Sequence, residues 1–154
     1  MSEKKVRIED MIPLMLERLE AGYEVTFSPY GTSMLPMLRQ GRDTVTLRAP
    51  SGRLSKYDLP LYRRDNGQYV LHRVVRVGET YACMGDNQFV LEEGIREDQI
   101  LAVCTAVTRK GKRQSLSSLR WRIYAVLWHR SRLLRRVILG IWRRTFGRLF
   151  RKRA

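Results

Sequence analysis

The segment YVLHRVVRV, residues Tyr69–Val77, carries the clearest strand signal in the sequence. It is rich in β-branched and aromatic residues, which favour strands. Asn66-Gly67 stands just before it, and this dipeptide is typical of a tight hairpin turn. The segment therefore predicts a strand entered through a turn, and the alternation of a strand puts His72 on the same face as Val70 and Val74.

Similar short runs lie on both sides of this segment. We expect further strands at Glu24–Tyr30, Thr44–Leu47, Leu59–Tyr62, Thr80–Met84 and Ile100–Thr108, because each run is bounded by turn-forming residues. Before them, apolar residues recur at helical spacing over Ile8–Ala21, and Gly22 is a natural stop. The prediction is a mainly β, compact antiparallel domain over residues 24–108, preceded by one N-terminal helix within residues 1–23.

The charge is divided unevenly along the chain. The whole sequence has a net charge of +15. Residues 1–98 hold all fifteen acidic residues and fourteen basic ones, whereas residues 99–154 hold sixteen basic residues and no acidic one. The polar stretch 109–118 reads as a linker, so we expect residues 119–154 to form a separate basic tail.

The tail has the pattern of an amphipathic helix. Leu134, Ile138, Ile141, Trp142 and Leu149 fall on one face, and Arg136, Arg143 and Arg151 project from the other. This pattern favours an anionic membrane surface as the partner, since tryptophan and arginine suit that interface. Nucleic acid is the second interpretation, because the arginines would also bind phosphate. A third is packing of the helix on its own domain or on a partner chain.

Several classes of protein are excluded by composition. Two cysteines, Cys83 and Cys104, cannot build a disulfide framework, and we expect both to be buried. No Cys/His cluster has metal-ligand spacing, so neither a metal site nor a cofactor is expected. No apolar run approaches the roughly 20 residues of a spanning helix, and the polar N-terminus has no signal-peptide pattern. We therefore expect a cytoplasmic protein, peripheral at the membrane.

The hexapeptide GTSMLP, residues 31–36, is a candidate nucleophile segment. Gly31 permits a tight turn after a strand, so Ser33 can be presented with a free backbone N–H. A nucleophilic serine needs an exposed hydroxyl and a donor aimed at the developing oxyanion. The alternative is that Ser33 simply caps a helical turn.

Two other residues could complete such a site. His72 has the unperturbed pKa of about 6.5 that suits a general base near neutral pH. Asp86, in Gly85-Asp86-Asn87, could orient and stabilise the imidazole of His72. The alternatives are a histidine satisfied within the core or at an edge, and a simple Asx-type turn at Asp86.

Taken together, the ordered segments GTSMLPML, GRDTVTL, YDLPLYRR, VLHRVV and MGDN resemble the superfamily that joins type I signal peptidases with LexA-like self-cleaving peptidases. The resemblance covers roughly residues 25–107. It implies a compact β-ribbon, barrel-like peptidase domain in which Ser33 is the nucleophile. It also implies that His72 is the general base, as in the histidine-using archaeal and endoplasmic-reticulum branch, and that Gly85-Asp86-Asn87 matches that branch.

The chain departs from the superfamily pattern in three respects. The second acidic pair of the histidine branch is replaced by the stretch 89–93, so the third catalytic residue is Asp86, Glu92 or neither. Gly31 stands where signal peptidases often have a serine, so the oxyanion hole would rest on backbone N–H groups of Gly31 and Ser33. We expect no N-terminal membrane anchor of the kind that signal peptidases have, because the sequence shows no spanning apolar run.

The resemblance implies a serine endopeptidase that cleaves signal- or leader-like peptides by a Ser-His mechanism, with small side chains before the cut site. The substrate would lie extended beside a strand of the domain, such as Glu24–Tyr30. Two alternatives stay open: a catalytically weak peptide-binding module of the same fold, and a LexA-like regulator that cleaves itself.

Overall fold

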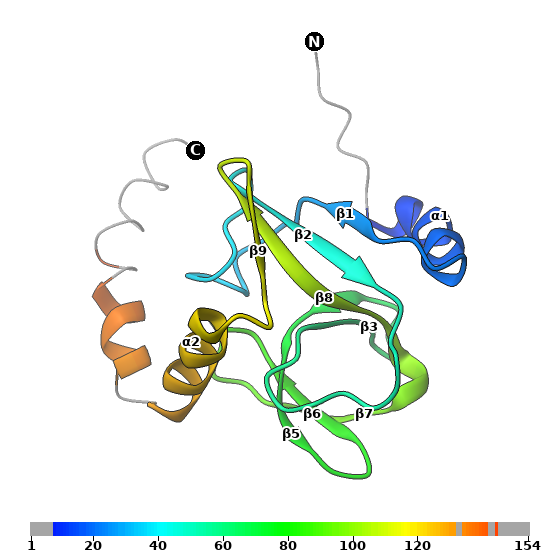
Figure 1. Ribbon diagram of the computed structural model, residues 1–154. Helices are drawn as coiled ribbons and strands as arrows, with labels where there is room; N and C mark the ends of the chain where they lie inside the picture. Colours follow the sequence, from blue (N-terminus) through cyan, green and yellow to red (C-terminus); the bar gives the residue numbers. More distant parts are fainter. Residues whose placement is uncertain (1–7, 132–133, 142–143, 145–154) are drawn as a thin grey trace.

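A computed structural model of the chain describes residues 8–131, 134–141 and 144 (Figure 1). Its helices are α1 (Ile8–Glu20), the 3₁₀ helix η1 (Glu97–Gln99) and α2 (Leu119–Arg130), and residues 134–141 are also helical. Its strands are β1 (Val25–Phe27), β2 (Asp43–Arg48), β3 (Pro60–Arg63), β4 (Tyr69–Leu71), β5 (Arg73–Val77), β6 (Tyr81–Met84), β7 (Glu92–Ile95), β8 (Ile100–Arg109) and β9 (Lys112–Ser115). The prediction of a mainly β, antiparallel protein with an N-terminal helix is confirmed.

The strands form two antiparallel sheets. One has the order β1-β2-β8-β3-β4, with β9 also paired to β8, and the other has the order β5-β6-β7. The long strand β8 is the spine of the larger sheet (Figure 1), with β2 along one side. Val103 pairs with both Arg48 and Pro60, so β3 lies on the opposite side of β8 from β2. Strand β9 pairs with a part of β8 that also pairs with β2, so β9 lies on the same side of β8 as β3.

The segment Tyr69–Val77 differs from its prediction as one continuous strand. It is divided into β4, which pairs with β3 in the larger sheet, and β5, which pairs with β6 in the smaller one. His72 is the residue between them, so it sits where the chain crosses from one sheet to the other. The His72 side chain is buried at this junction.

Two strands lie where none was expected. Strand β7 is short and largely charged, which hides it from a search for apolar alternation. Strand β9 occupies the predicted linker 109–118 and closes a hairpin with β8 through the turn at Lys110-Gly111. The prediction of a linker there was wrong, because the polar side chains of β9 fit a strand that is mostly exposed. Strand β1 is also shorter than the predicted Glu24–Tyr30, since it ends before Pro29.

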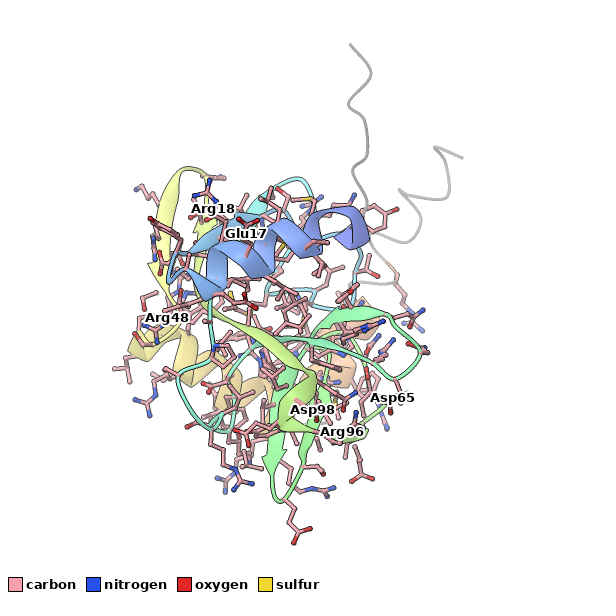
Figure 2. The ribbon with its side chains drawn as sticks, turned by 90° about the vertical axis from the view of Figure 1, so that its right-hand side faces the viewer. Glu17, Arg18, Arg48, Asp65, Arg96 and Asp98 are labelled. Carbon is pink, nitrogen blue, oxygen red and sulfur yellow. The ribbon has the colours of Figure 1, made fainter. Side chains whose placement is uncertain are left out.

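Helix α1 covers one face of the larger sheet. Its residues Ile12, Met15 and Leu19 are buried in a core that also contains Val45 and Leu47 of β2. Its outer side carries charged residues, and Figure 2 shows Glu17 and Arg18 there. A second, smaller core fills the space around the β5-β6-β7 sheet and includes Tyr62, Val74 and Cys83.

The predicted tail packs on its own domain over the part that is described. Trp121, Ala125 and Trp128 of α2 are buried, and they lie on one helical face at offsets of four and three residues. In the helical stretch 134–141 the buried positions are Arg135 and Leu139.

The predicted face of this stretch differs from the structure. Leu134 and Ile141 are exposed, Ile138 is half-buried and Arg136 is exposed. Trp142, Arg143, Leu149 and Arg151, which the sequence placed in the same pattern, lie outside the described residues. Among the described helices, none has both the length and the apolar character to cross a bilayer.

Replacement of Leu47 tests the packing of the larger core. Leu47 is fully buried, so Leu47→Ala should lower the free energy of unfolding by roughly 2–5 kcal/mol through lost burial and the cavity left behind. Leu14→Ala, on the exposed side of α1, should change it by less than about 0.5 kcal/mol. Urea denaturation followed by circular dichroism measures both values, and equal effects would contradict the described core.

Candidate active site

Ser33 and His72, separated by 39 positions in the sequence, line the same small cavity. The cavity has a volume of about 220 Å³, and its other lining residues come from the segment after β1, from Arg64, from β4 and from Gln88. Ser33 reaches it from the turn that follows β1, and His72 reaches it from the junction of β4 and β5. The predicted pairing of these two side chains in one site is thus compatible with the fold.

Gly85 allows the serine loop, the stretch between β1 and β2 that carries Ser33, to approach His72 closely. A Cβ atom at this position would lie 2.7 Å from the carbonyl oxygen of Ser33 and 3.1 Å from Nε2 of His72. Real Cβ atoms do not approach backbone oxygens so closely, so a side chain here would push the two residues apart. Gly85 is therefore a steric requirement of the site.

Glu92 is the carboxylate that contacts His72. Its Oε1 lies 2.9 Å from Nδ1 of His72. The same carboxylate accepts hydrogen bonds from the Tyr62 hydroxyl at 3.0 Å and from Nε of Arg64 at 2.8 Å, and it is also paired with Nη2 of Arg64. An acceptor at Nδ1 favours the tautomer that carries its proton there, which leaves the lone pair on Nε2. That nitrogen lies beside Gly85, as described above.

The surroundings keep these groups in useful protonation states. Burial lowers the pKa of His72 below its ordinary value, although the nearby Glu92 charge opposes the shift. Burial also works against the ionised form of Glu92, but the hydrogen bonds from Arg64 and Tyr62 outweigh it and lower the Glu92 pKa. Burial, together with the Glu92 charge, raises the pKa of Tyr62 well above its usual range. At neutral pH the group is therefore a neutral imidazole against an ionised carboxylate.

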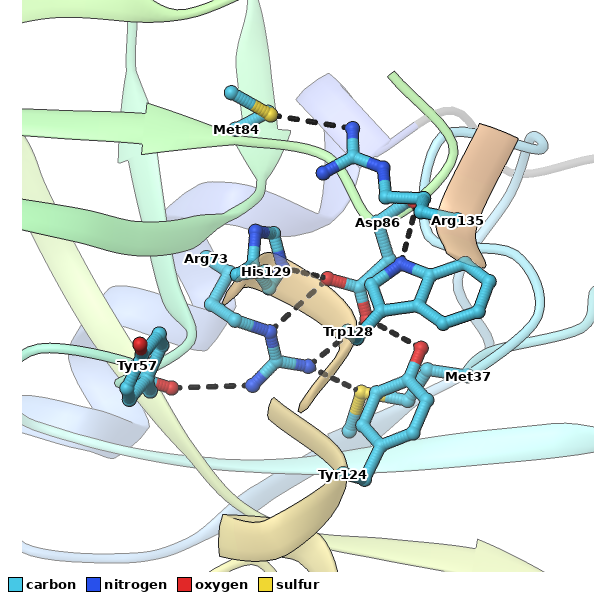
Figure 3. Close-up of polar contacts among 9 residues, drawn as sticks. All are labelled: Met37, Tyr57, Arg73, Met84, Asp86, Tyr124, Trp128, His129 and Arg135. Atoms are coloured by element: carbon cyan, nitrogen blue, oxygen red, sulfur yellow. Dashed lines mark hydrogen bonds and ion pairs between the residues drawn. The ribbon is translucent and has the colours of Figure 1, made fainter. Parts of the chain in front are cut away.

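Asp86 lies in a different environment from the one predicted for it. Its carboxylate is fully buried and is held by Arg73, Tyr124 and His129 (Figure 3). Nε and Nη2 of Arg73 each lie 3.0 Å from it, the Tyr124 hydroxyl donates at 3.0 Å, and Nε2 of His129 lies at 2.9 Å. The prediction that Asp86 orients His72 is corrected: these contacts occupy the carboxylate, and Glu92, the alternative acid, contacts His72.

The Asp86 cluster ties helix α2 to the site. Besides the carboxylate contacts, the indole N–H of Trp128 donates to the main-chain oxygen of Asp86 at 2.8 Å. Burial alone would raise the pKa of Asp86, but the charge of Arg73 and the contacts with His129 and Arg73 hold it far below its usual range. Arg73 also donates to the carbonyl of Tyr57 at 3.1 Å. A carboxylate buried in this way stays charged only because its partners come from both the sheet and α2.

The three residues Gly85, Asp86 and Asn87 each hold a different neighbour. Gly85 permits the close approach just described, and Asp86 fixes the loop to Arg73 and α2. The backbone N–H of Asn87 donates to the Ser33 carbonyl at 2.7 Å, and its side-chain amide donates to the Thr32 carbonyl at 3.0 Å. The tripeptide therefore holds the serine loop in place.

The two predicted oxyanion donors, the backbone N–H groups of Gly31 and Ser33, differ in whether they already have a hydrogen-bond acceptor. The Gly31 N–H donates to Oε1 of Gln40 at 3.2 Å, so it is already engaged. The φ of Gly31 is 97°, which confirms that this position needs the left-handed region. Within the described part of the chain the Ser33 N–H has no hydrogen-bond acceptor, so it is available to a bound group.

Sequence reasoning missed the partners of the two carboxylates. His129, Tyr124 and Trp128 lie beyond the segment taken for a linker, and nothing in their spacing ties them to Asp86. Tyr62 lies on β3 of the larger sheet and Arg64 just after it, whereas Glu92 begins β7 of the smaller sheet, so only the packing of the two sheets brings them together. A search for apolar or nucleophilic residues does not single out such supporting groups.

The other nucleophilic and metal-binding side chains do not contribute to this site. Cys83 and Cys104 are buried and unpaired, and burial raises the pKa of each thiol to about 12. Thiols of this kind stay protonated and behave as small apolar residues. Among the described residues, no group of His, Cys, Asp and Glu is arranged to hold a metal ion.

Comparison with protein-family models, with curated proteins and with solved structures gives no match to this chain.

The protonation of His72 is open to direct measurement. Burial lowers its pKa, so the His72 imidazole signal in NMR should titrate below pH 6.5, the ordinary value for histidine. Because the Glu92 charge raises this pKa, Glu92→Gln should move the titration to a still lower pH. The exposed neighbour provides the control: Glu93→Gln should leave it unchanged. A His72 pKa above 6.5, or an upward shift in Glu92→Gln, would contradict the described contact.

The Asp86 cluster predicts a pH-dependent contribution to stability. Asp86→Asn leaves the Arg73 charge buried without its partner and should lower the free energy of unfolding at pH 7 by roughly 3–5 kcal/mol. The folded-state pKa of Asp86 is depressed, so the contribution is full above the unfolded pKa of about 4 and is lost as the pH falls below it. Denaturation of both proteins at pH 7 and pH 3 measures the difference. Asp98→Asn, at an exposed position, should have no comparable effect.

Proposed function

We propose that the protein is a serine endopeptidase in which Ser33 is the nucleophile, His72 the general base and Glu92 the orienting acid. The observation that carries the proposal is the contact of Glu92 with Nδ1 of His72, with Ser33 and His72 in one cavity. A neutral imidazole oriented in this way is what activation of a serine hydroxyl requires. The resemblance to the signal peptidase and LexA-like superfamily supports the same assignment of Ser33 and His72.

The proposed reaction follows the usual sequence of acyl transfer. Nε2 of His72 takes the proton of the Ser33 hydroxyl while its oxygen attacks the scissile carbonyl carbon. The developing oxyanion is bound by the free Ser33 N–H, and Glu92 stabilises the imidazolium that forms. His72 then gives the proton to the leaving amine, and water activated by His72 hydrolyses the acyl-enzyme.

An extended peptide is the substrate that best fits the surroundings of Ser33. Strand β4 is the last in the order of the larger sheet, and within the described residues no strand pairs with its outer edge, where a peptide can add as a further strand. Its three residues line the cavity together with Pro29 and Tyr30. We expect the peptide to lie along β4, with the segment after β1 on the other side. A cavity of about 220 Å³ has room for a small side chain beside the cut site.

Substitutions in the site test the mechanism. On fluorogenic, leader-like peptides with alanine before the cut site, Ser33→Ala should lower kcat/KM at least about 10³-fold, because the nucleophile is lost. Glu92→Gln should lower it roughly 10²–10⁴-fold, because the imidazole loses its orientation. Gly85→Ala should lower it about 10²-fold by displacing the serine loop from His72. The rates are measured by peptide hydrolysis with correctly folded protein.

Matched controls keep these outcomes interpretable. Asp98→Asn alters an exposed carboxylate and Gly78→Ala meets only ordinary contacts, so both should keep full activity. Undiminished cleavage by Ser33→Ala excludes the serine mechanism. Tight binding of peptides without cleavage would instead identify a peptide-binding module, and a fragment of the chain itself, formed only with Ser33 intact, would identify a self-cleaving regulator.

A further inference from the structure

Helix α2 is apolar on two opposite sides. One side, with Trp121, Ala125 and Trp128, is buried against the domain. The other side exposes Leu119, Ile123, Val126 and Leu127, and Leu127 has 56% of its surface accessible. At 100° per residue these four fall within one arc of the helix. The contacts with the domain therefore leave a second apolar stripe uncovered.

Arginines border this stripe. Arg120 and Arg122 flank it on either side of the helix and Arg130 lies in line with it, and all three are exposed. An apolar stripe edged by arginines is the arrangement in which the side chains can extend sideways to charged groups while the stripe enters an apolar layer.

The helical stretch 134–141 repeats the arrangement. It turns Arg135 and Leu139 toward the domain, whereas Leu134 and Val137 are 47% and 51% exposed. Figure 1 shows this stretch next to α2 on one side of the molecule. Arg136 and Arg144 add positive charge there, and both are exposed.

A second group of cations borders α2. A cavity of about 950 Å³ lies between α2 and the loop after β2, and Arg48, Arg53, Lys56 and Arg122 are among the residues that line it. Its single acidic lining residue is Asp58, whose carboxylate accepts a hydrogen bond from the Ser55 N–H at 2.8 Å. Positively charged side chains therefore also border the apolar stripe on the side of the loop after β2.

We propose that the outer surface of α2 and residues 134–141 docks on an anionic lipid bilayer, with the apolar stripe in the headgroup and acyl boundary and the arginines at lipid phosphates. Charge selects this occupant. Residues 99–154 contain no acidic residue, so a second copy that docked through the same surface would meet like charge. Nucleic acid would satisfy the arginines but would leave the exposed leucine, isoleucine and valine side chains in water. The proposal does not depend on the peptidase activity.

Vesicle binding of the full-length protein tests the proposal. The protein should cosediment with vesicles of phosphatidylcholine and phosphatidylglycerol (70:30, about 0.1 M salt) and only weakly with pure phosphatidylcholine, since each arginine near an anionic surface contributes roughly fivefold in affinity. Ile123→Asn/Leu127→Asn should lower binding to the anionic vesicles at least about tenfold. Arg120→Gln/Arg122→Gln should lower it roughly 25-fold.

A matched pair outside α2 and residues 134–141 serves as the control. Leu14 on α1 is 63% exposed and Arg39 is also exposed, so Leu14→Asn/Arg39→Gln should bind as the unchanged protein does. An environment-sensitive fluorophore on Leu127→Cys should shift to shorter wavelength with anionic vesicles, and one on Leu14→Cys should not. The native cysteines are buried and do not compete for the label.

Three results would overturn the proposal. The first is equal binding to neutral and anionic vesicles, or none to either. The second is equal loss of binding in the control pair and in the α2 variants. The third is tight binding to a 20-base-pair DNA duplex together with weak vesicle binding, which would identify nucleic acid as the partner.

Discussion

The buried carboxylate of Asp86 is the constraint on which the arrangement of the site depends. An ionised carboxylate without partners costs several kcal/mol in a protein interior, so the surroundings must supply donors. Arg73 supplies two from the β5 strand, and Tyr124 and His129 supply one contact each from α2. The loop after β6, strand β5 and helix α2 are thereby fixed to one point.

The contacts of Asp86 also fix the positions of the candidate catalytic residues. Gly85 and Asn87 are the immediate neighbours of Asp86, and they contact the serine loop and His72. Arg73 directly follows His72, so the partner of Asp86 and the proposed general base are adjacent residues in the chain. Glu92 then sets the tautomer of His72 from the other side. The two acids divide two tasks: Asp86 holds the architecture, and Glu92 sets the state of the imidazole.

Much of the fold could be predicted from local sequence. Apolar periodicity predicted α1, and short runs of strand-forming residues bounded by turn residues predicted β2, β3, β6 and β8. The segment Tyr69–Val77 shows the limit of this reasoning. Its composition indicates a strand but contains nothing that marks the change of sheet at His72, which depends on the pairing of distant strands.

The candidate site was predictable in part for a related reason. Ser33, His72 and both acids were identified as candidates from their residue types and the superfamily resemblance, yet the choice of Glu92 for His72 required the register of three strands. The contacts of α2 were not predictable, since a stretch of basic and apolar residues reads equally well as a tail. Helix α2 has two apolar sides: one is buried against the domain and the other is exposed.

Peptide mapping by mass spectrometry after reaction with a fluorophosphonate tests whether His72 and Glu92 activate Ser33. An activated serine is phosphonylated, whereas an ordinary surface serine is not. We expect one adduct, on Ser33, whose rate of formation rises with pH as His72 loses its proton and falls sharply in Glu92→Gln. A folded protein that forms no adduct, or forms it on another residue, would show that Ser33 is not an activated nucleophile.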